Sequence, residues 1–195
     1  MSYHSSKTVQ EIFIHGRTLS HWLNEPVTDE TLHEIYNLMK WGPTSANCCP
    51  IRILFLKSLE EKNKLLPCLD PGNVEKTRTA PVTAILAQDL QFYEKLPQLY
   101  PHGDAKSWFV GKKSHIETTA FRNSTLQGAY LMMAARSLGL DCGPMSGFSN
   151  DKVDATFFAG TTWKSNFLCN LGHGDHSKLY PRSPRLNFEE TCKII

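Results

Sequence analysis

The sequence lacks the features that mark membrane, nucleic-acid-binding and secreted proteins. Its longest apolar runs, such as 80–87, are far too short to cross a bilayer, so no membrane partner is expected. The net charge is only +2, and no dense run of lysine and arginine argues for nucleic acid as a partner. The first seven residues lack the charged-then-apolar layout of a signal peptide, which leads us to expect a cytoplasmic location.

The six cysteines show neither CxxC pairing nor histidines at zinc-ligand spacing. Free thiols in a reducing compartment are therefore expected, rather than a disulfide framework. His173 and His176 lie in a glycine-rich polar stretch that is more typical of a turn than of a metal site, and no metal is expected. The adjacent Cys48 and Cys49 are expected to be inert or mildly reactive members of a ligand-binding loop.

Nucleotide-binding loops of the common kinds are also missing. No GxGxxG follows a predicted strand, and GxxxxGK[ST] does not occur. The composition, with 41% hydrophobic and 21% charged residues, is that of a globular protein, and the length suits one domain spanning 1–195. Predicted helices and strands interleave without regular βαβ repeats, which favours an α+β fold with one sheet flanked by helices.

Hydrophobic periodicity, together with glycine, proline and helix-capping residues at element ends, predicts the elements of this fold. Helices are expected at about 29–41, 59–66, 117–138 and 150–158, with a short one near Glu189. Strands are expected at 51–56, 80–87 and 166–171. A turn is expected at 71–73, and the irregular stretch 97–115 is of a length that is usually functional or mobile.

Helix caps and inner faces are predicted from the same pattern. Thr28, Ser58 and Asn150 are expected to cap three of the helices. The first helix is expected to bury one face, which consists of Leu32, Ile35, Tyr36 and Met39. The long helix is expected to turn inward a face that consists of Phe121, Leu126, Ala129, Tyr130, Met133 and Ala134.

The segment 41–50 is the most informative part of the chain. It joins a predicted amphipathic helix to a predicted strand, and it consists largely of Gly, Pro, Thr, Ser, Asn and Cys. Its hydroxyls, amide and free backbone N–H groups suit a polar planar ligand. A plain helix-to-strand turn uses the same residue types, so composition alone leaves both interpretations open.

Within this segment, the run 43–50 resembles the Pro-Ser-Ser-x-Asn-x-Gln-Pro loop of the FMN-dependent nitroreductase family, with Cys49 in place of Gln. The similarity extends from about Arg17 to Leu186. It implies a nitroreductase-like α+β fold with a central, mostly antiparallel sheet, and an intertwined homodimer. It also implies FMN as the cofactor, bound at the subunit interface.

The resemblance implies that both ends of the chain bind the FMN phosphate. Arg17, Thr18 and His21 match the family's N-terminal phosphate segment, in which His21 replaces a permanently charged base. Arg185 matches a C-terminal cation that completes this site, with Lys178 or Arg182 as its partner. Taken alone, these residues would be interpreted as surface cations and a surface or structural histidine.

Three further groups match positions around the flavin ring. The loop residues Pro43, Thr44, Ser45 and Asn47 would serve the flavin of the second subunit. A pair at the pyrimidine side of the ring would be Asn73 and Lys76. The segment under the ring would be Pro144, Met145, Ser146 and Gly147, where Ser146 replaces the family's Glu and Gly147 permits close approach.

Within the family, 41–47, 118–124, 143–148 and 163–168 are most similar to the malonic semialdehyde reductase branch of pyrimidine degradation. The resemblance implies ping-pong hydride transfer from NAD(P)H through the flavin to the aldehyde, which becomes 3-hydroxypropanoate. No catalytic side chain is identified. Alternatives are a generalist nitro- or quinone reductase and a flavin-binding protein without turnover. A cation for the acceptor's carboxylate would come from Arg122, Lys164 or Lys112-Lys113.

Overall fold

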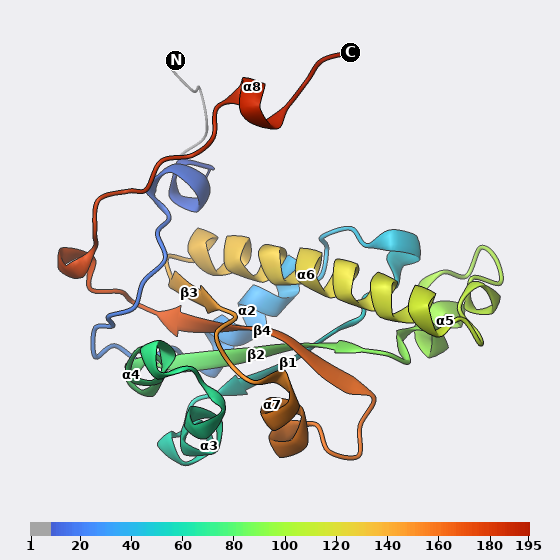
Figure 1. Ribbon diagram of the computed structural model, residues 1–195, viewed down its shortest axis with the longest axis horizontal. Helices are drawn as coiled ribbons and strands as arrows, with labels where there is room; N and C mark the ends of the chain where they lie inside the picture. The colour runs from blue at the N-terminus through green and yellow to red at the C-terminus, as the bar shows by residue number, and fades with distance from the viewer. Residues whose placement is uncertain (1–8) are drawn as a thin grey trace.

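The computed structural model describes residues 9–195 and is built around a four-stranded antiparallel sheet (Figure 1). The strands follow the order β1 (Ile51–Leu56), β2 (Val82–Asp89), β4 (Trp163–Gly172) and β3 (Asp141–Met145). Every neighbouring pair is antiparallel, so the predicted α+β class with an antiparallel sheet is confirmed. The edges of this sheet are β1 and β3.

Helices cover both faces of the sheet. They are α2 (Asp29–Met39), α3 (Leu59–Leu65), α4 (Pro71–Thr79), α5 (Leu96–Leu99), α6 (Lys113–Ser137), α7 (Asn150–Phe157) and α8 (Phe188–Thr191). Short 3-10 or π-helical turns lie at Gln10–His15, Ser45–Asn47, Leu66–Cys68, Phe92–Lys95, Lys106–Trp108 and His176–Lys178. In the part of the chain that the structure describes, no helix combines the length and the apolar character needed to span a bilayer.

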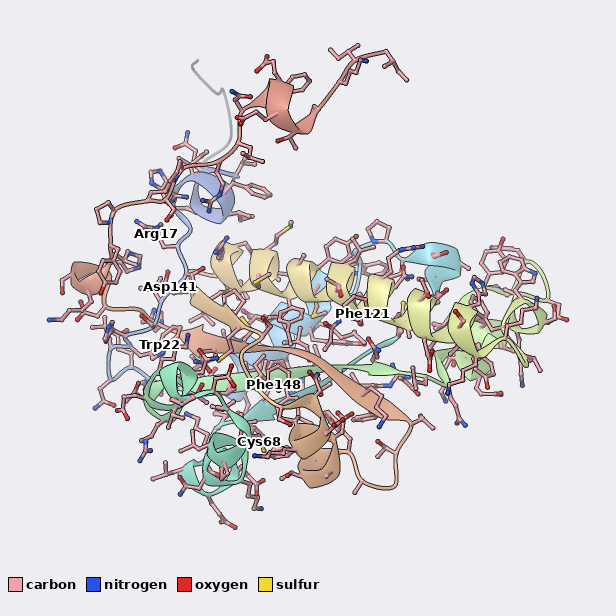
Figure 2. The ribbon with its side chains drawn as sticks, viewed as in Figure 1. Arg17, Trp22, Cys68, Phe121, Asp141 and Phe148 are labelled. Carbon is pink, nitrogen blue, oxygen red and sulfur yellow. The ribbon has the colours of Figure 1, made fainter. Side chains whose placement is uncertain are left out.

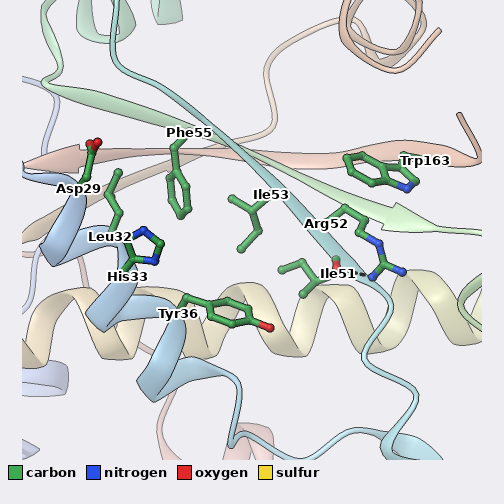
Figure 3. A pocket seen from close by; sticks show the side chains of 9 residues that line it. All are labelled: Asp29, Leu32, His33, Tyr36, Ile51, Arg52, Ile53, Phe55 and Trp163. Carbon is green, nitrogen blue, oxygen red and sulfur yellow. Dashed lines mark hydrogen bonds between the residues drawn. The ribbon is translucent and has the colours of Figure 1, made fainter. Parts of the chain in front are cut away.

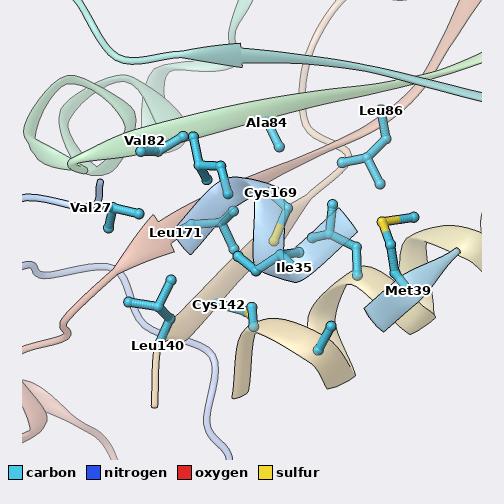
Figure 4. Packing of buried hydrophobic residues seen from close by; sticks show 14 of the residues in the cluster. Val27, Ile35, Met39, Val82, Ala84, Leu86, Leu140, Cys142, Cys169 and Leu171 are labelled. Carbon is cyan, nitrogen blue, oxygen red and sulfur yellow. The ribbon is translucent and has the colours of Figure 1, made fainter. Parts of the chain in front are cut away.

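Side chains of β2 alternate between two apolar cores, as the period of a strand requires. Val82, Ala84 and Leu86 face α2 and α6, whereas Ile85 and Ala87 belong to the cluster beneath α3 and α7. Figure 4 shows the first core, in which side chains of α2 interdigitate with those of the sheet. Because both faces of β2 are covered, this strand is the most buried element of the fold.

The prediction for α2 is largely confirmed. The Thr28 hydroxyl caps the helix by accepting a hydrogen bond from the Thr31 N–H at 3.2 Å. Three of the four residues predicted to face inward are buried, but Tyr36 is 51% exposed. Ser58 caps α3 in the same way, by accepting from the Glu61 N–H at 3.2 Å.

The inner face of α6 differs from the prediction. Phe121 and Leu126 are exposed, and of the six predicted residues only Ala134 is buried. The buried positions include the polar residues Asn123 and Gln127. Their side-chain oxygens accept hydrogen bonds from the backbone N–H groups of Ser45, at 2.8 Å, and Ile51, at 3.0 Å. This helix therefore uses polar groups to satisfy a neighbouring loop and strand, and it leaves apolar side chains outside.

The structure of other segments also differs from the sequence-based predictions. The predicted turn at 71–73 is the first turn of α4, in which Pro71 occupies a position that prolines favour. The strand β3 was not predicted, because Gly143 and Pro144 are typical of loops; Pro144 is tolerated because β3 is an edge strand. The cap of α7 is Ser149 rather than Asn150. The stretch 97–115 contains short helical turns.

Candidate functional site

A basic hollow of about 510 Å³ lies where the N-terminal segment, the end of α6 and the C-terminal segment meet. All of its charged lining residues are cationic, and they are Arg17, Arg136, Lys178, Arg182 and Arg185. Guanidinium groups bind phosphate through paired N–H donors. A site with five cations and no carboxylate in its lining is suited to a phosphate group.

Backbone carbonyls hold the arginines that build the walls of the basic hollow. Arg17 Nη2 donates to the Tyr180 carbonyl at 2.7 Å, which joins the two ends of the chain. Arg182 Nη2 donates to the Ile14 carbonyl at 2.6 Å and strengthens the same junction. Among residues 9–195, Arg185 donates only to the carbonyls of its two preceding residues, at 3.1 and 3.0 Å. Each guanidinium retains further N–H groups for a ligand.

The predicted phosphate residues are only partly gathered here. Thr18 lines the basic hollow beside Arg17 and pairs with Cys142 of β3 through an isolated bridge. His21 is not part of its lining. The carbonyl of His21 instead accepts a hydrogen bond from the Asp175 N–H at 2.9 Å, which is a structural contact.

Asn73 and Gly147 form a second group, at the start of α4 and just after β3. The Asn73 Nδ2 donates to the Gly147 carbonyl at 2.7 Å, and the Asp70 N–H donates to the same oxygen at 3.0 Å. A Cβ on Gly147 would lie 2.6 Å from Asn73 Nδ2 and 2.8 Å from Asp70 Oδ2. Any larger residue here would displace the Asn73 amide or the Asp70 carboxylate, so glycine lets the start of α4 pack closely against the segment after β3.

Trp22 connects this second group to the basic hollow. Its Nε1 donates to the Lys76 carbonyl at 2.9 Å, which ties α4 to the segment that carries Arg17. Figure 2 shows Arg17, Asp141 and Trp22 one below another along one side of the molecule. The sequence interpretation missed Trp22, because a single tryptophan between predicted elements carries no signal of its partner.

The segment after β3 presents backbone rather than large side chains. Pro144 is half-buried, and Ser146 is exposed. Met145 is buried, and its Sδ accepts a hydrogen bond from Thr77 Oγ1 at 3.6 Å. The side chain of Met145 therefore belongs to the core.

The loop 43–47 meets α6 at Asn123 and Tyr130, whereas the basic hollow adjoins Arg136 in the last turn of that helix. The Pro43 carbonyl accepts from the Tyr130 hydroxyl at 2.9 Å, and Asn47 Nδ2 donates to the Leu99 carbonyl at 2.9 Å. The structure thus separates this loop from the basic hollow of its own chain.

The loop is conformationally strained. Three non-glycine residues adopt positive φ, namely Ala46 and Asn47 at 50° and Cys49 at 40°. The Thr44 hydroxyl holds the bend by accepting from the Cys49 N–H at 3.2 Å. Strain of this kind persists only where surrounding contacts enforce it, and it is concentrated at functional sites.

The two loop cysteines differ in their surroundings. Burial raises the pKa of the Cys48 thiol to about 12, so it stays protonated and unreactive at neutral pH. The Cys49 thiol is partly exposed and donates to Asn47 Oδ1 at 3.4 Å.

A second cationic hollow, the α6 hollow, lies on the first turns of that helix. Its lining consists of Lys112, Lys113, Ser114, His115, Thr118 and Arg122. The His115 ring stacks on Phe109, with ring centroids 4.8 Å apart and planes at 5°. Lys113 reaches Glu117 at 3.9 Å, whereas among the described residues Arg122 has no ion pair. Lys164 lies elsewhere and pairs with Asp154 at 3.3 Å.

Comparison with known proteins identifies the family. The model of the nitroreductase family matches residues 17–173. The chain belongs to the nitroreductase family. A family relative from Polynucleobacter asymbioticus, named "Putative NADH dehydrogenase/NAD(P)H nitroreductase", is 60% identical over 191 residues, which are 98% of this chain and 97% of that protein.

Solved structures show the same nitroreductase fold. A "putative nitroreductase in complex with FMN" from Exiguobacterium sibiricum superimposes with a TM-score of 0.85 and 20% identity over all of both chains. A "putative NAD(P)H:FMN oxidoreductase" from Staphylococcus epidermidis gives a TM-score of 0.86, with 20% identity and the same full coverage. At these identities the likeness establishes the fold.

Proposed function

We propose that this protein is an FMN-dependent NAD(P)H oxidoreductase. The basic hollow is the observation that carries this proposal, because it offers five cations to a phosphate without an acidic side chain in its lining. The names of the relative and of the two solved structures support the same cofactor and reductant. The buried Nε of Arg136 has no hydrogen-bond partner among the described residues, which fits a site that is completed by a ligand.

Each group of site residues has a distinct role in this proposal. Arg17, Thr18 and Arg185 hold the phosphate, whereas Asn73 and Gly147 flank the ring. The Lys76 ammonium stabilises negative charge on the pyrimidine side. The chemistry that bound FMN supplies is acceptance of hydride from NAD(P)H and its donation to a second substrate.

Purified protein should be yellow, with flavin absorption bands and about one FMN per chain. NADPH or NADH should bleach these bands without added acceptor, and an acceptor should restore them. Colourless protein that takes up no FMN from an excess would contradict the proposal. Bound flavin that neither nucleotide reduces would instead favour a flavin-binding protein without turnover.

A homodimer is the second part of the proposal. The loop 43–47 lies away from the basic hollow of its own chain, so a neighbouring copy must supply this loop if it is to contact the flavin. Large apolar side chains are exposed just before this loop and on α6, among them Trp41, Phe121 and Leu126. Exposed apolar surface of this kind marks an interaction site.

A groove of about 610 Å³ beside β1 is a second surface for the other copy. Figure 3 shows Tyr36 of α2 and Ile53 and Phe55 of β1 among its lining side chains. Because β1 is an edge strand, its outer backbone groups are available to a further strand. The C-terminal tail stands away from the body in Figure 1 and exposes Leu186 and Phe188. Exchange of this tail would give the dimer its intertwined form.

Light scattering should report twice the 22.1 kDa chain mass for the wild-type protein. The double variant Trp41→Glu/Phe121→Glu should shift the protein to the monomer and release FMN, because a charge at the centre of an interface is not compensated. Leu59→Glu, on the exposed side of α3, is the matched control and should stay dimeric. A wild-type monomer with full flavin occupancy would exclude the dimer.

For the acceptor, we propose a small acid aldehyde such as malonic semialdehyde. The α6 hollow supports this choice, because two of its cations, Lys112 and Arg122, have no ion pair within the described part of the chain and can bind a carboxylate. Asn123, adjacent to Arg122, holds the backbone of Ser45 in the flavin-facing loop. In the proposed homodimer, the α6 hollow therefore lies with that loop beside the flavin of the partner subunit. Lys164 is a weaker candidate, because Asp154 already neutralises it.

Arg122→Ala should lower kcat/KM for malonic semialdehyde by up to about a hundredfold, the value of a carboxylate contact worth roughly 2–3 kcal/mol. An uncharged aldehyde of similar size should be nearly unaffected, and Lys164→Ala should leave both substrates unchanged. If nitroaromatics or quinones react orders of magnitude faster than any acid aldehyde, the protein is a generalist reductase.

A further inference from the structure

The guanidinium of Arg136, in the last turn of α6, is only partly used by the protein. Its Nη1 donates to the Ile12 carbonyl at 2.9 Å, which anchors one end of the group. Its Nη2 makes a long hydrogen bond of 3.4 Å to the Arg17 carbonyl. Its Nε is buried and has no partner among the described residues. A buried donor without an acceptor is rare in native proteins and calls for an explanation.

The Nε and Nη2 atoms form the edge through which an arginine grips an oxyanion with two parallel N–H donors. In Arg136 this edge carries only the one long bond, whereas the opposite end is anchored. We infer that Arg136 binds the phosphate of FMN through its Nε–Nη2 edge, an inference that rests on the proposed function. The unpaired Nε–H then gains an acceptor when the cofactor binds.

The charges around Arg136 favour one side for the phosphate. Arg136 also lines a second cavity of about 440 Å³, but that cavity includes the carboxylates of Glu11 and Asp141. These two carboxylates offset part of the charge of the three arginines in that lining, which are Arg17, Arg136 and Arg182. The acid-free lining of the basic hollow attracts an anion more strongly. Gly16 lines both spaces, and a Cβ on this residue would lie 3.0 Å from Arg136 Nε. The missing side chain therefore keeps this edge of the guanidinium uncrowded.

The same geometry gives Arg136 a positioning role. Its bonds to the carbonyls of Ile12 and Arg17 hold the N-terminal segment against the end of α6. A loss of FMN affinity after mutation could therefore arise through Arg17 alone. The test consequently needs a readout that reports on the Arg136 Nε–H itself.

That readout is the ¹H–¹⁵N signal of the Arg136 Nε–H in the apoprotein, identified as the arginine signal that is absent from Arg136→Lys. We expect FMN to shift this signal, inorganic phosphate to shift it in the same direction, and riboflavin to leave it in place. The Nε–H of Arg78, which lies on the exposed side of α4 at 3.4 Å from Glu75, is the internal control and should not move.

Fluorescence titrations complete the test. Arg136→Lys should weaken FMN binding by about tenfold or more, because a single ammonium cannot form the two parallel hydrogen bonds of a guanidinium. Riboflavin binding should change little, and Arg78→Lys should leave both affinities unchanged. Wild-type protein that binds FMN without any shift of the Arg136 signal overturns the inference and leaves the proposed function intact. Wild-type protein that binds no FMN overturns the proposed function.

Discussion

Replacement of Phe92 by alanine is expected to lower the free energy of unfolding by about 3–5 kcal/mol, the usual cost of removing a fully buried aromatic side chain. Phe92 is 0% exposed and lies at the centre of a third apolar cluster beside the sheet. Its ring packs edge-to-face on Phe109, with centroids 4.9 Å apart. Urea unfolding of the two proteins at equal concentration measures the difference.

This substitution should also disturb the ligand loop, because Cys48 belongs to the same cluster and is fully buried. The strained residues around it lose their support when the cluster contains a cavity. Leu59→Ala, at an exposed position of α3, is the control and should cost no more than about 0.5 kcal/mol. A loss of less than about 1 kcal/mol for Phe92→Ala would show that this cluster does not stabilise the fold.

The second large effect concerns the cations of the basic hollow. Arg17→Ala and Arg185→Ala should each weaken FMN binding by about 1.5–3 kcal/mol, as expected for a hydrogen bond between charged groups. Riboflavin has no phosphate, so its affinity should fall much less. Fluorescence titration of the apoprotein gives both affinities.

His21→Ala is the matched control for these variants, because His21 lies in the same segment but outside the lining of the basic hollow. Its FMN affinity should equal that of the wild type. Equal losses for FMN and riboflavin in the arginine variants would mean that Arg17 and Arg185 act through folding and not through the phosphate.

Local signals in the sequence predicted the elements whose ends are set by their own residues. The bounds of β1 and the starts of α2 and α3 are correct, because hydroxyl caps and apolar periodicity act within a few residues. The inner face of α6 could not be predicted in this way. Its buried Asn123 and Gln127 are stable only because distant backbone groups bond to them, and a periodicity argument places such residues at the surface.

The residues of the candidate site were likewise only partly predictable from the sequence. The family resemblance led to Arg17, which lines the basic hollow, and to Asn73 and Gly147, which are hydrogen-bonded to each other. It did not lead to Arg136, because a cation in the last turn of a helix is ordinarily explained by the helix dipole. Only the fold shows that this residue meets the N-terminal segment more than a hundred positions away along the chain.

The junction between Arg182 and Ile14 also bears on biosynthesis. These residues are 168 positions apart, and their hydrogen bond joins the C-terminal wall of the basic hollow to the N-terminal segment. Chains emerge from the ribosome N-terminus first, so Arg17 is available long before its opposite wall exists. A nascent or prematurely terminated chain that ends before residue 178 contains all four strands but lacks Lys178, Arg182 and Arg185 of the basic hollow. On the proposed function, in which the basic hollow holds the FMN phosphate, cofactor loading belongs to the last stage of synthesis.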